Sequence, residues 1–139
     1  MTVELPADYR PSADEPYMNP RQLEYFRQRL LKWREELLEE SQQTINHLRE
    51  DRQGVGDEVD RANSESETSL ELRTRDRYRK LLGKIDAALQ RIEDGSYGYC
   101  EVTGEEIGVR RLEARPIASM TVEAQERHER TEGHYADLR

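Results

Sequence analysis

The sequence has a single cysteine, a single phenylalanine, a single tryptophan and no long hydrophobic run. Cys100 alone cannot form an internal disulfide bond or a zinc site built from several cysteines. The apolar runs are too short to cross a membrane, and the first residues lack the apolar region of a signal peptide. We therefore expect a cytoplasmic protein without a membrane segment.

Charged residues (37%) outnumber hydrophobic residues (34%), and the net charge is −8. That composition is common in disordered chains. However, Ala, Glu, Lys, Leu and Arg make up nearly half of the sequence, which is typical of long helices and coiled coils. The acidic excess disfavours direct binding to the phosphate backbone of DNA. The composition therefore favours a long, thin helical protein over one with a large core.

Two heptad patterns predict a helical hairpin over residues 19–95. The first helix should begin at Asn19-Pro20, because asparagine caps helix ends and proline suits the first helical position. Gly54 and Gly56 predict a turn and place the hairpin tip near residues 53–62. Two long helices joined by a short turn fold back as an antiparallel pair. The predicted seams are Leu23, Phe26, Leu30, Trp33, Leu37, Thr44 and Leu48 in the first helix, and Leu70, Thr74, Arg77 or Tyr78, Leu81, Ile85, Ala88 and Ile92 in the second.

A turn centred near residue 55 also predicts which residues face each other across the hairpin. Trp33 should lie beside Tyr78, so that apolar side chains meet. The same register places the glutamates at 36, 39 and 40 near Arg73 and Arg75.

The remaining segments differ in character from the hairpin. Residues 1–18 contain three prolines and no apolar period, which predicts an irregular arm. Glycines punctuate residues 96–118, which predicts short strands in a small globular end. Residues 119–132 predict a polar helix capped by Ser119 or Thr121. The predicted fold class is mainly α.

Four segments of the chain are more specific than its heptads: Ser69–Arg73 (Ser-Leu-Glu-Leu-Arg), Gly98–Glu101 (Gly-Tyr-Cys-Glu), Glu106–Gly108 (Glu-Ile-Gly) and Arg110–Pro116 (Arg-Arg-Leu-Glu-Ala-Arg-Pro). Together with Tyr17-Met18-Asn19, Phe26 and Trp33, they resemble the DksA/TraR family of bacterial proteins over residues 17–124. The resemblance implies a long coiled-coil hairpin, then a small zinc-finger-like domain with a C-terminal helix over residues 96–139.

The resemblance also implies a function. Members of the family bind RNA polymerase through its secondary channel and modulate promoter complexes, for example by inhibiting ribosomal RNA promoters together with the alarmone ppGpp. We therefore expect a monomeric transcription factor with no direct DNA binding. Asp57, Asp60 and Ala62 match the functional residues of the family's tip, where two carboxylates would approach a cationic, Mg²⁺-bearing site. Alternatively, Asp57 only caps the second helix and Asp60 places negative charge in its first turn.

The zinc finger implied by the resemblance is degenerate here. Where the family has four cysteines, this sequence has Cys100, Thr103, Thr121 and Ala124. Threonine and alanine do not replace thiolates as structural zinc ligands, so we expect no bound zinc. An apolar cluster should hold this end together instead, with Tyr97, Tyr99, Val102, Ile107, Val109, Leu112, Met120 and Val122 as its candidates.

Basic residues of the second helix and the finger are the other candidate site. The resemblance implies that Arg77 contacts polymerase and that Leu81, Lys84 and Arg115 contact ppGpp. A further lysine of the family's ppGpp site is Gln125 here, which removes one charged contact. Alternatively, the basic run of residues 73–80 forms salt bridges with glutamates of the first helix.

Two functions of other classes also fit an acidic hairpin. One is a transcript-cleavage factor like the Gre proteins, which hold Mg²⁺ and water in the same channel. The other is a structural coiled-coil scaffold without polymerase affinity. The sequence has no catalytic set of its own, since Cys100 lacks a neighbouring base and no glycine-rich phosphate loop is present. We therefore expect no enzyme activity.

Overall fold

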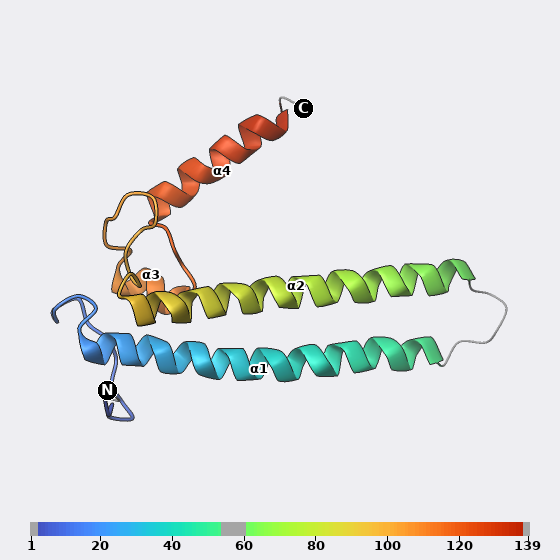
Figure 1. The fold of residues 1–139 in the computed structure, drawn as a ribbon, viewed down its shortest axis with the longest axis horizontal. Coiled ribbons are helices and arrows are strands. Elements are labelled where there is room, and N and C mark those ends of the chain that lie inside the picture. Colours follow the sequence, from blue (N-terminus) through green and yellow to red (C-terminus); the bar gives the residue numbers. More distant parts are fainter. Residues whose placement is uncertain (1–2, 54–60, 138–139) are drawn as a thin grey trace. The chain divides into compact units, whose positions relative to one another are not determined.

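The computed structural model describes residues 3–53 and 61–137, with side chains described for residues 3–51 and 65–133. It contains four helices, α1 (Pro20–Gln53), α2 (Arg61–Asp94), α3 (Val109–Ala114) and α4 (Val122–Asp137) (Figure 1). The chain divides into two compact units, which we call the hairpin unit (residues 31–86) and the base unit (residues 1–30 and 87–139). None of the described helices is long and apolar enough to span a membrane.

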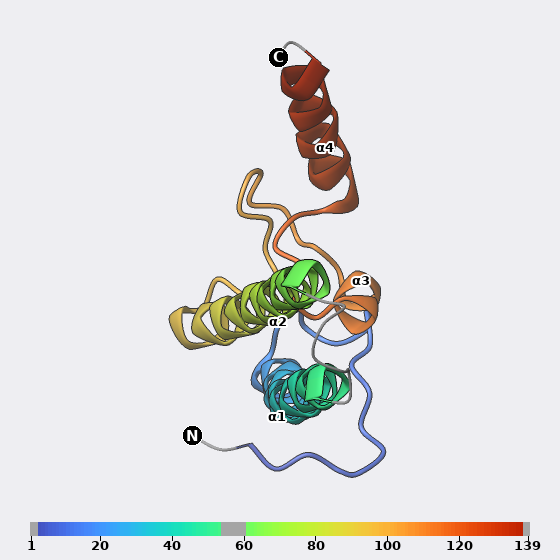
Figure 2. The ribbon, with the colours of Figure 1, turned by 90° about the vertical axis from the view of Figure 1, so that its right-hand side faces the viewer.

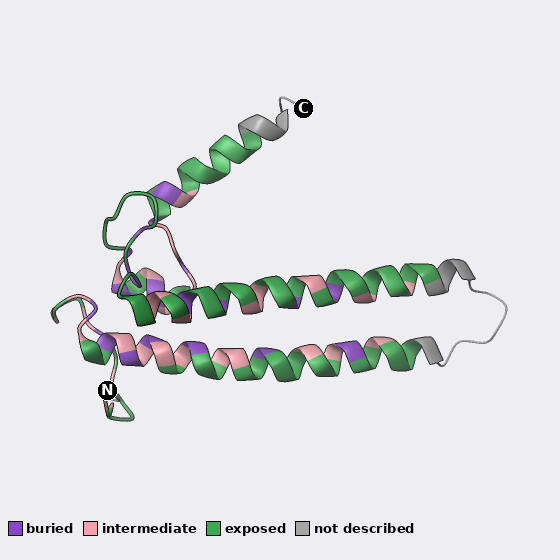
Figure 3. Ribbon diagram, viewed as in Figure 1, coloured by how far each residue is buried: buried purple, intermediate pink, exposed green. Residues whose placement is uncertain are grey.

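The hairpin unit contains the later part of α1 and the earlier part of α2, which run side by side in opposite directions (Figures 1 and 2). This arrangement confirms the antiparallel hairpin predicted from the heptads. Its buried side chains are Leu37, Ile45, Thr74, Tyr78 and Ile85, and Figure 3 shows how narrow this buried seam is beside the exposed surface. A seam this thin leaves most of both helices in solvent, as the charged composition requires.

The predicted register across the hairpin is wrong. The hydroxyl groups of Thr44 and Tyr78 lie 3.2 Å apart, so Tyr78 pairs with a residue about three turns beyond Trp33. Arg34 Nε donates to Asp86 Oδ1 at 2.7 Å in the same register. Seam residues recur every three or four positions along each helix, so apolar spacing alone fits several registers and cannot select one.

Two further details of the seam differ from the sequence analysis. Leu70 is 43% exposed rather than buried, while Ile45, not predicted in the seam, is only 3% exposed. Straight helices drift relative to a strict seven-residue repeat, so the buried stripe shifts by one position along α1.

The base unit is built around two fully buried aromatic rings. Phe26 of α1 and Tyr97 lie with their ring centroids 5.6 Å apart, and Leu112 of α3 is also fully buried. The predicted short strands do not form in the described residues, where Tyr99 and Glu106 make one isolated antiparallel bridge. Residues 109–114 form α3 instead, because their side chains favour a helix once Gly108 has ended the loop.

Glycines with positive φ explain why no strand forms. Gly98, Gly104 and Gly108 adopt φ angles of 92°, 75° and 103°, so the chain reverses every few residues. At Gly98 a side chain would also clash, because a Cβ atom there would lie 2.7 Å from Cγ of Met18.

The segment before α1 has no helix or strand among its described residues but is held by side chains. Gln22 is fully buried, its Oε1 accepts a hydrogen bond from the Met18 amide at 2.8 Å, and its Nε2 donates to the Ser12 carbonyl at 3.0 Å. Asn19 Oδ1 accepts hydrogen bonds from the amides of Arg21 and Gln22, which confirms the predicted helix start.

Candidate functional site

The predicted tip residues lie at the limit of what the structure describes. Asp57 and Asp60 lie outside the described residues, as does the side chain of Ala62, whose backbone belongs to α2. The functional assignment of these three residues therefore stays a prediction.

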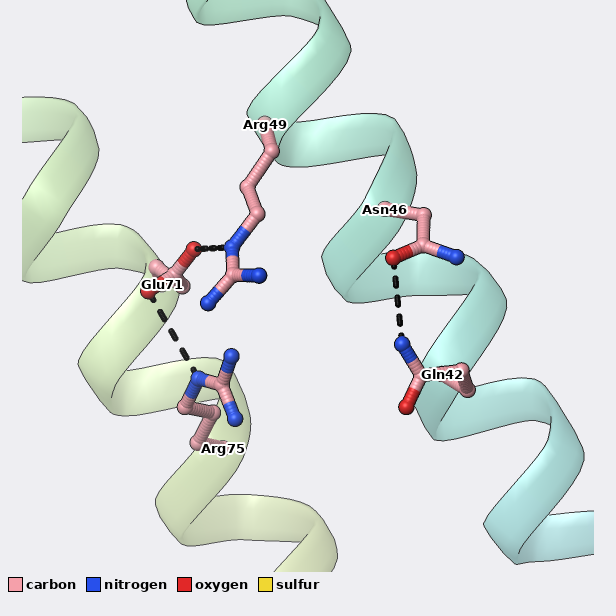
Figure 4. A network of polar contacts seen from close by, with 5 residues as sticks. All are labelled: Gln42, Asn46, Arg49, Glu71 and Arg75. Atoms are coloured by element: carbon pink, nitrogen blue, oxygen red, sulfur yellow. Dashed lines mark hydrogen bonds and ion pairs between the residues drawn. The ribbon is translucent and has the colours of Figure 1, made fainter.

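An ion-pair network links α1 to α2 within the hairpin unit. Arg49 Nε of α1 lies 3.1 Å from Glu71 Oε1 of α2, and Arg75 Nε lies 3.5 Å from Oε2 of the same carboxylate (Figure 4). The Glu71 side chain is only 12% exposed, which limits solvent screening of these pairs. Arg75 thus pairs within its own helix, and the predicted partnership with the glutamates at 36, 39 and 40 is wrong.

The rest of the basic run on α2 splits into paired and unpaired cations. Asp76 accepts from Lys80 at 3.0 Å and from Arg79 at 2.6 Å, and these two bonds lower the pKa of its carboxyl group. By contrast, Arg77 and Lys84 form no ion pair with any residue that the structure describes. The Arg77 guanidinium instead lies 5.5 Å from the centroid of the Tyr78 ring.

Arg77 and Lys84 lie seven residues apart, so they share one exposed face of α2. Leu81 lies between them and is half-buried. The third predicted ppGpp residue, Arg115, belongs to the base unit, is exposed and ends α3 with its amide 2.7 Å from the Arg111 carbonyl. Bringing Arg115 together with Lys84 stays part of the proposal below.

The four degenerate finger positions are described completely. Thr121 Oγ1 accepts a hydrogen bond from the Ala124 amide at 3.2 Å, and Thr103 Oγ1 accepts one from the Glu105 amide at 3.3 Å. Cys100, Thr121 and Ala124 are all buried. One thiol, two hydroxyl groups already bonded to the backbone, and a methyl group do not fit a four-thiolate zinc site. No group of three potential His, Cys, Asp or Glu ligands occurs among the described residues.

The Cys100 thiol has polar neighbours that favour its thiolate form. Burial raises its pKa, but bonds from the Thr103 hydroxyl and from the backbone amides of Thr103, Thr121 and Val102 outweigh that effect and lower the pKa to about 7. The loop therefore still folds around the sulfur with two of the other finger positions beside it. The groups that favour the Cys100 thiolate are a hydroxyl and backbone amides of the protein itself.

Side chain to backbone hydrogen bonds hold α3 and the segment that follows it. The buried Tyr97 hydroxyl donates to the Pro116 carbonyl at 2.8 Å, and Arg111 Nε donates to the Met120 carbonyl at 3.0 Å. Arg29 Nη1 of α1 donates to the Glu113 carbonyl at 2.9 Å. Neither arginine could be assigned this role from the sequence, because a charged side chain that reaches a backbone carbonyl carries no periodic signal.

Besides the two arginines, Tyr17 belongs to this network without having been predicted in it. Its hydroxyl donates to the Gly98 carbonyl at 2.6 Å and accepts from the Gly108 amide at 2.9 Å. The tyrosine therefore connects the segment before α1 to both ends of the finger loop. The only signal for it was its place in the Tyr17-Met18-Asn19 motif.

The predicted apolar cluster is about half correct. Tyr97, Ile107, Val109 and Leu112 are buried, while Tyr99, Val102 and Val122 are 38%, 66% and 45% exposed. The exposed three lie in the loop and in the first turn of α4, where the hydrogen bonds described above replace apolar packing.

Two family models match most of the chain. The N-terminal domain of the DnaK suppressor protein DksA matches residues 22–92, and the prokaryotic dksA/traR C4-type zinc finger matches residues 95–130. The Caulobacter vibrioides RNA polymerase-binding transcription factor DksA is 64% identical over 131 residues, covering 94% of this chain and 92% of the relative. The Escherichia coli K12 protein of the same name is 48% identical, covering 83% of this chain and 76% of the relative.

A solved structure resembles the fold as well. The transcription factor DksA2 from Pseudomonas aeruginosa has a TM-score of 0.75 and 44% sequence identity, covering 85% of this chain and 91% of that one. The sequence segments that carry the family resemblance lie mostly in the matched regions. The zinc finger model matches residues 95–130 even though this chain has one cysteine there, Cys100. This chain therefore belongs to the DksA family.

Proposed function

We propose that this chain binds RNA polymerase and regulates transcription, without catalysing a reaction of its own. The observation that carries the proposal is the 64% identity over almost the full length of a relative named as an RNA polymerase-binding transcription factor. The antiparallel pair of α1 and α2 supports it, because the family's hairpin is the part that reaches into the enzyme.

The hairpin acts through the secondary channel, with Asp57, Asp60 and Ala62 at its tip. Cross-helix bonds support this role: Arg34 to Asp86 and Arg49 to Glu71 link the helices at separate points of the hairpin unit. Two linked helices resist bending better than one. A stiff hairpin can hold the carboxylates of its tip close to the metal-bearing centre of the polymerase.

The alarmone ppGpp strengthens the effect by binding between the chain and polymerase, where Leu81, Lys84 and Arg115 contact it. Lys84 and Arg115 are exposed and make no described ion pair, so their charges are available to phosphate groups. Gln125 is neutral and therefore brings no cation to this site. Its side-chain amide donates a hydrogen bond to Glu129 Oε1 at 3.1 Å. The sensitivity to ppGpp should therefore be lower than with a lysine at this position.

The base unit needs no zinc to fold. The capped start of α4 and the bonds from Tyr97 and Arg111 are the interactions that take the place of the metal. The chain acts as a monomer in the cytoplasm and does not bind DNA directly, in keeping with its net charge of −8.

The experiment that tests this function measures binding of the purified chain to RNA polymerase, followed by two activity assays on the same complex. We expect saturable binding and altered stability of promoter complexes, with no transcript cleavage in stalled elongation complexes. Cleavage of stalled transcripts would assign the chain to the Gre-like class instead. A stable oligomer without polymerase affinity would make it a scaffold.

A further inference from the structure

A pocket of about 530 Å³ lies within the base unit, and none of the candidate site residues discussed above lines it. The start of α1 and the end of α2 form it together with Val3 of the N-terminal segment. Leu23 and Ile92 give it apolar walls, while its polar lining comes from Glu24, Arg27 and Glu93. A volume of this size is typical of small-molecule sites, which combine apolar walls with a few placed polar groups.

Glu24 is the unusual member of this lining, because its side chain is only 10% exposed. Arg27 Nη1 and Gln28 Nε2 each lie 3.2 Å from its carboxylate, and both contact the same oxygen, Oε1. The other oxygen, Oε2, accepts no hydrogen bond from the described residues. In a side chain this little exposed, a carboxylate oxygen without a donor is unfavourable, so Oε2 is an open acceptor for a ligand.

The charge around the pocket is negative. Glu24 and Glu93 oppose the single cation Arg27. The amides of Ser96 and Tyr97 both donate to the Arg91 carbonyl, so neither is bonded to the carbonyls of Ile92 and Glu93, four residues before them. Unpaired carbonyls at a helix end carry partial negative charge.

The helix start on the other side of the pocket does not offset this charge. The amides of Arg21 and Gln22, the first two of α1 that could donate, are both bonded to Asn19 Oδ1. The pocket therefore favours a positively charged hydrogen-bond donor, and its apolar walls favour an aliphatic stem.

We propose that this pocket binds an organic cation, an ammonium or guanidinium group carried on an aliphatic stem. The cation donates a hydrogen bond to Glu24 Oε2, Glu93 adds a second negative charge, and the stem packs against Leu23 and Ile92. An anion is repelled by the two carboxylates, and a neutral apolar molecule leaves Oε2 without a donor. A free amine and a lysine or arginine side chain of a partner protein both carry this chemistry.

The direct test titrates the purified full chain with n-pentylammonium chloride and follows backbone amide NMR shifts. We expect saturable shifts around residues 23–27 and 92–93 with a dissociation constant of about 1 mM, a usual affinity for so small a ligand. Pentan-1-ol, which lacks the charge, and ammonium chloride, which lacks the stem, should each bind at least about tenfold more weakly. Equal binding of the alcohol, or no saturable shift with the amine, overturns the proposal.

Variants locate the binding site. Glu24→Gln keeps the shape of the side chain and should raise the dissociation constant about tenfold or more, while the exposed control Glu126→Gln should leave it unchanged. Glu93→Gln should raise it by a smaller factor and serves as the second variant if Glu24→Gln unfolds. Binding that is unchanged in both pocket variants contradicts the proposal.

A second arm distinguishes the two sources of the cation. If Glu24→Gln or saturating n-pentylammonium weakens binding of the chain to RNA polymerase, the occupant is a basic side chain of the polymerase. If polymerase binding is unaffected while the amine still binds, the occupant is a free amine. The first titration contains no polymerase, so a failure of the proposed function leaves its result intact.

Discussion

The hydroxyl oxygen of Thr121 accepts a hydrogen bond from the amide of Ala124, 3.2 Å away, and so caps the first turn of α4. Both residues stand where the family's finger has cysteines, and both are nearly buried, at 6% and 3% exposure. A side chain that bonds the third amide of a helix fixes where that helix begins. At these two positions the structure therefore has a helix cap, and we propose that this cap stabilises the start of α4 without metal.

Loss of this cap should destabilise the base unit. Thr121→Val keeps the shape of the side chain but removes the acceptor, which should cost about 1 kcal/mol and lower Tm by several degrees. Thermal denaturation followed by circular dichroism measures the effect. Thr131→Val is the matched control, because among the described residues the Thr131 hydroxyl bonds only to the Arg127 carbonyl, on the exposed part of α4. Equal losses in the two variants would contradict the capping role.

The buried hydrogen bond from the Tyr97 hydroxyl to the Pro116 carbonyl should contribute measurably to the stability of the base unit. Tyr97→Phe leaves that carbonyl without its donor in a buried site, which should cost about 1–3 kcal/mol in the free energy of unfolding. Urea denaturation measures it. The control is Tyr99→Phe, since Tyr99 is 38% exposed. A loss below about 0.5 kcal/mol for Tyr97→Phe would show that the bond does not hold the segment.

The thiol of Cys100 should make the base unit more stable at higher pH. Its pKa in the folded chain is lowered to about 7, below the ordinary value of 9.0, because hydrogen bonds favour the thiolate. The thiolate's contribution is therefore complete above about pH 9 and lost as the pH falls through 7. Thermal denaturation between pH 6.5 and pH 9.5 should show a rise in Tm that is absent in Cys100→Ser. A difference between the two proteins that does not change with pH would contradict this assignment.

The unpaired charge of Lys84 should matter for the response to ppGpp. Lys84→Ala should lower the effect of ppGpp on promoter inhibition about tenfold, while inhibition without the alarmone stays near the wild-type level. The measurement is in vitro transcription over a range of ppGpp concentrations. Lys80→Ala is a control from the same helix, because Lys80 is already paired with Asp76. The same loss in both variants would assign the effect to the overall charge of α2.

Helix existence could be predicted from the sequence, but helix register could not. Asn19 with Pro20 signals the start of α1, and Thr121 signals the start of α4, because capping chemistry is local. The pairing of Thr44 with Tyr78 depends on which of several equivalent heptad matches is best. Polar contacts such as Arg49 with Glu71 select among these matches, and no periodic pattern encodes them.

The base unit shows a second limit of sequence analysis. The glycines at 98, 104 and 108 predicted turns, while the valine and isoleucine residues between them predicted strands. The positive φ angles of these glycines prevent the strands. The bonds from Arg29 and Arg111 to carbonyls join residues distant in sequence, so only the folded structure places them. The degenerate finger positions, by contrast, could be named in advance because the family motif fixes their spacing.

We expect the chain to regulate RNA polymerase through the acidic tip of its hairpin, and to do so without bound metal. The measurement that tests this expectation is in vitro transcription from a ribosomal RNA promoter, with a zinc chelator present throughout and with or without ppGpp. We expect the chain to reduce transcription despite the chelator, Asp60→Asn to lose this inhibition, and the control Asp51→Asn, from the exposed end of α1, to keep it. Inhibition by Asp60→Asn equal to that of the unaltered chain, or its abolition by chelator, would contradict the account.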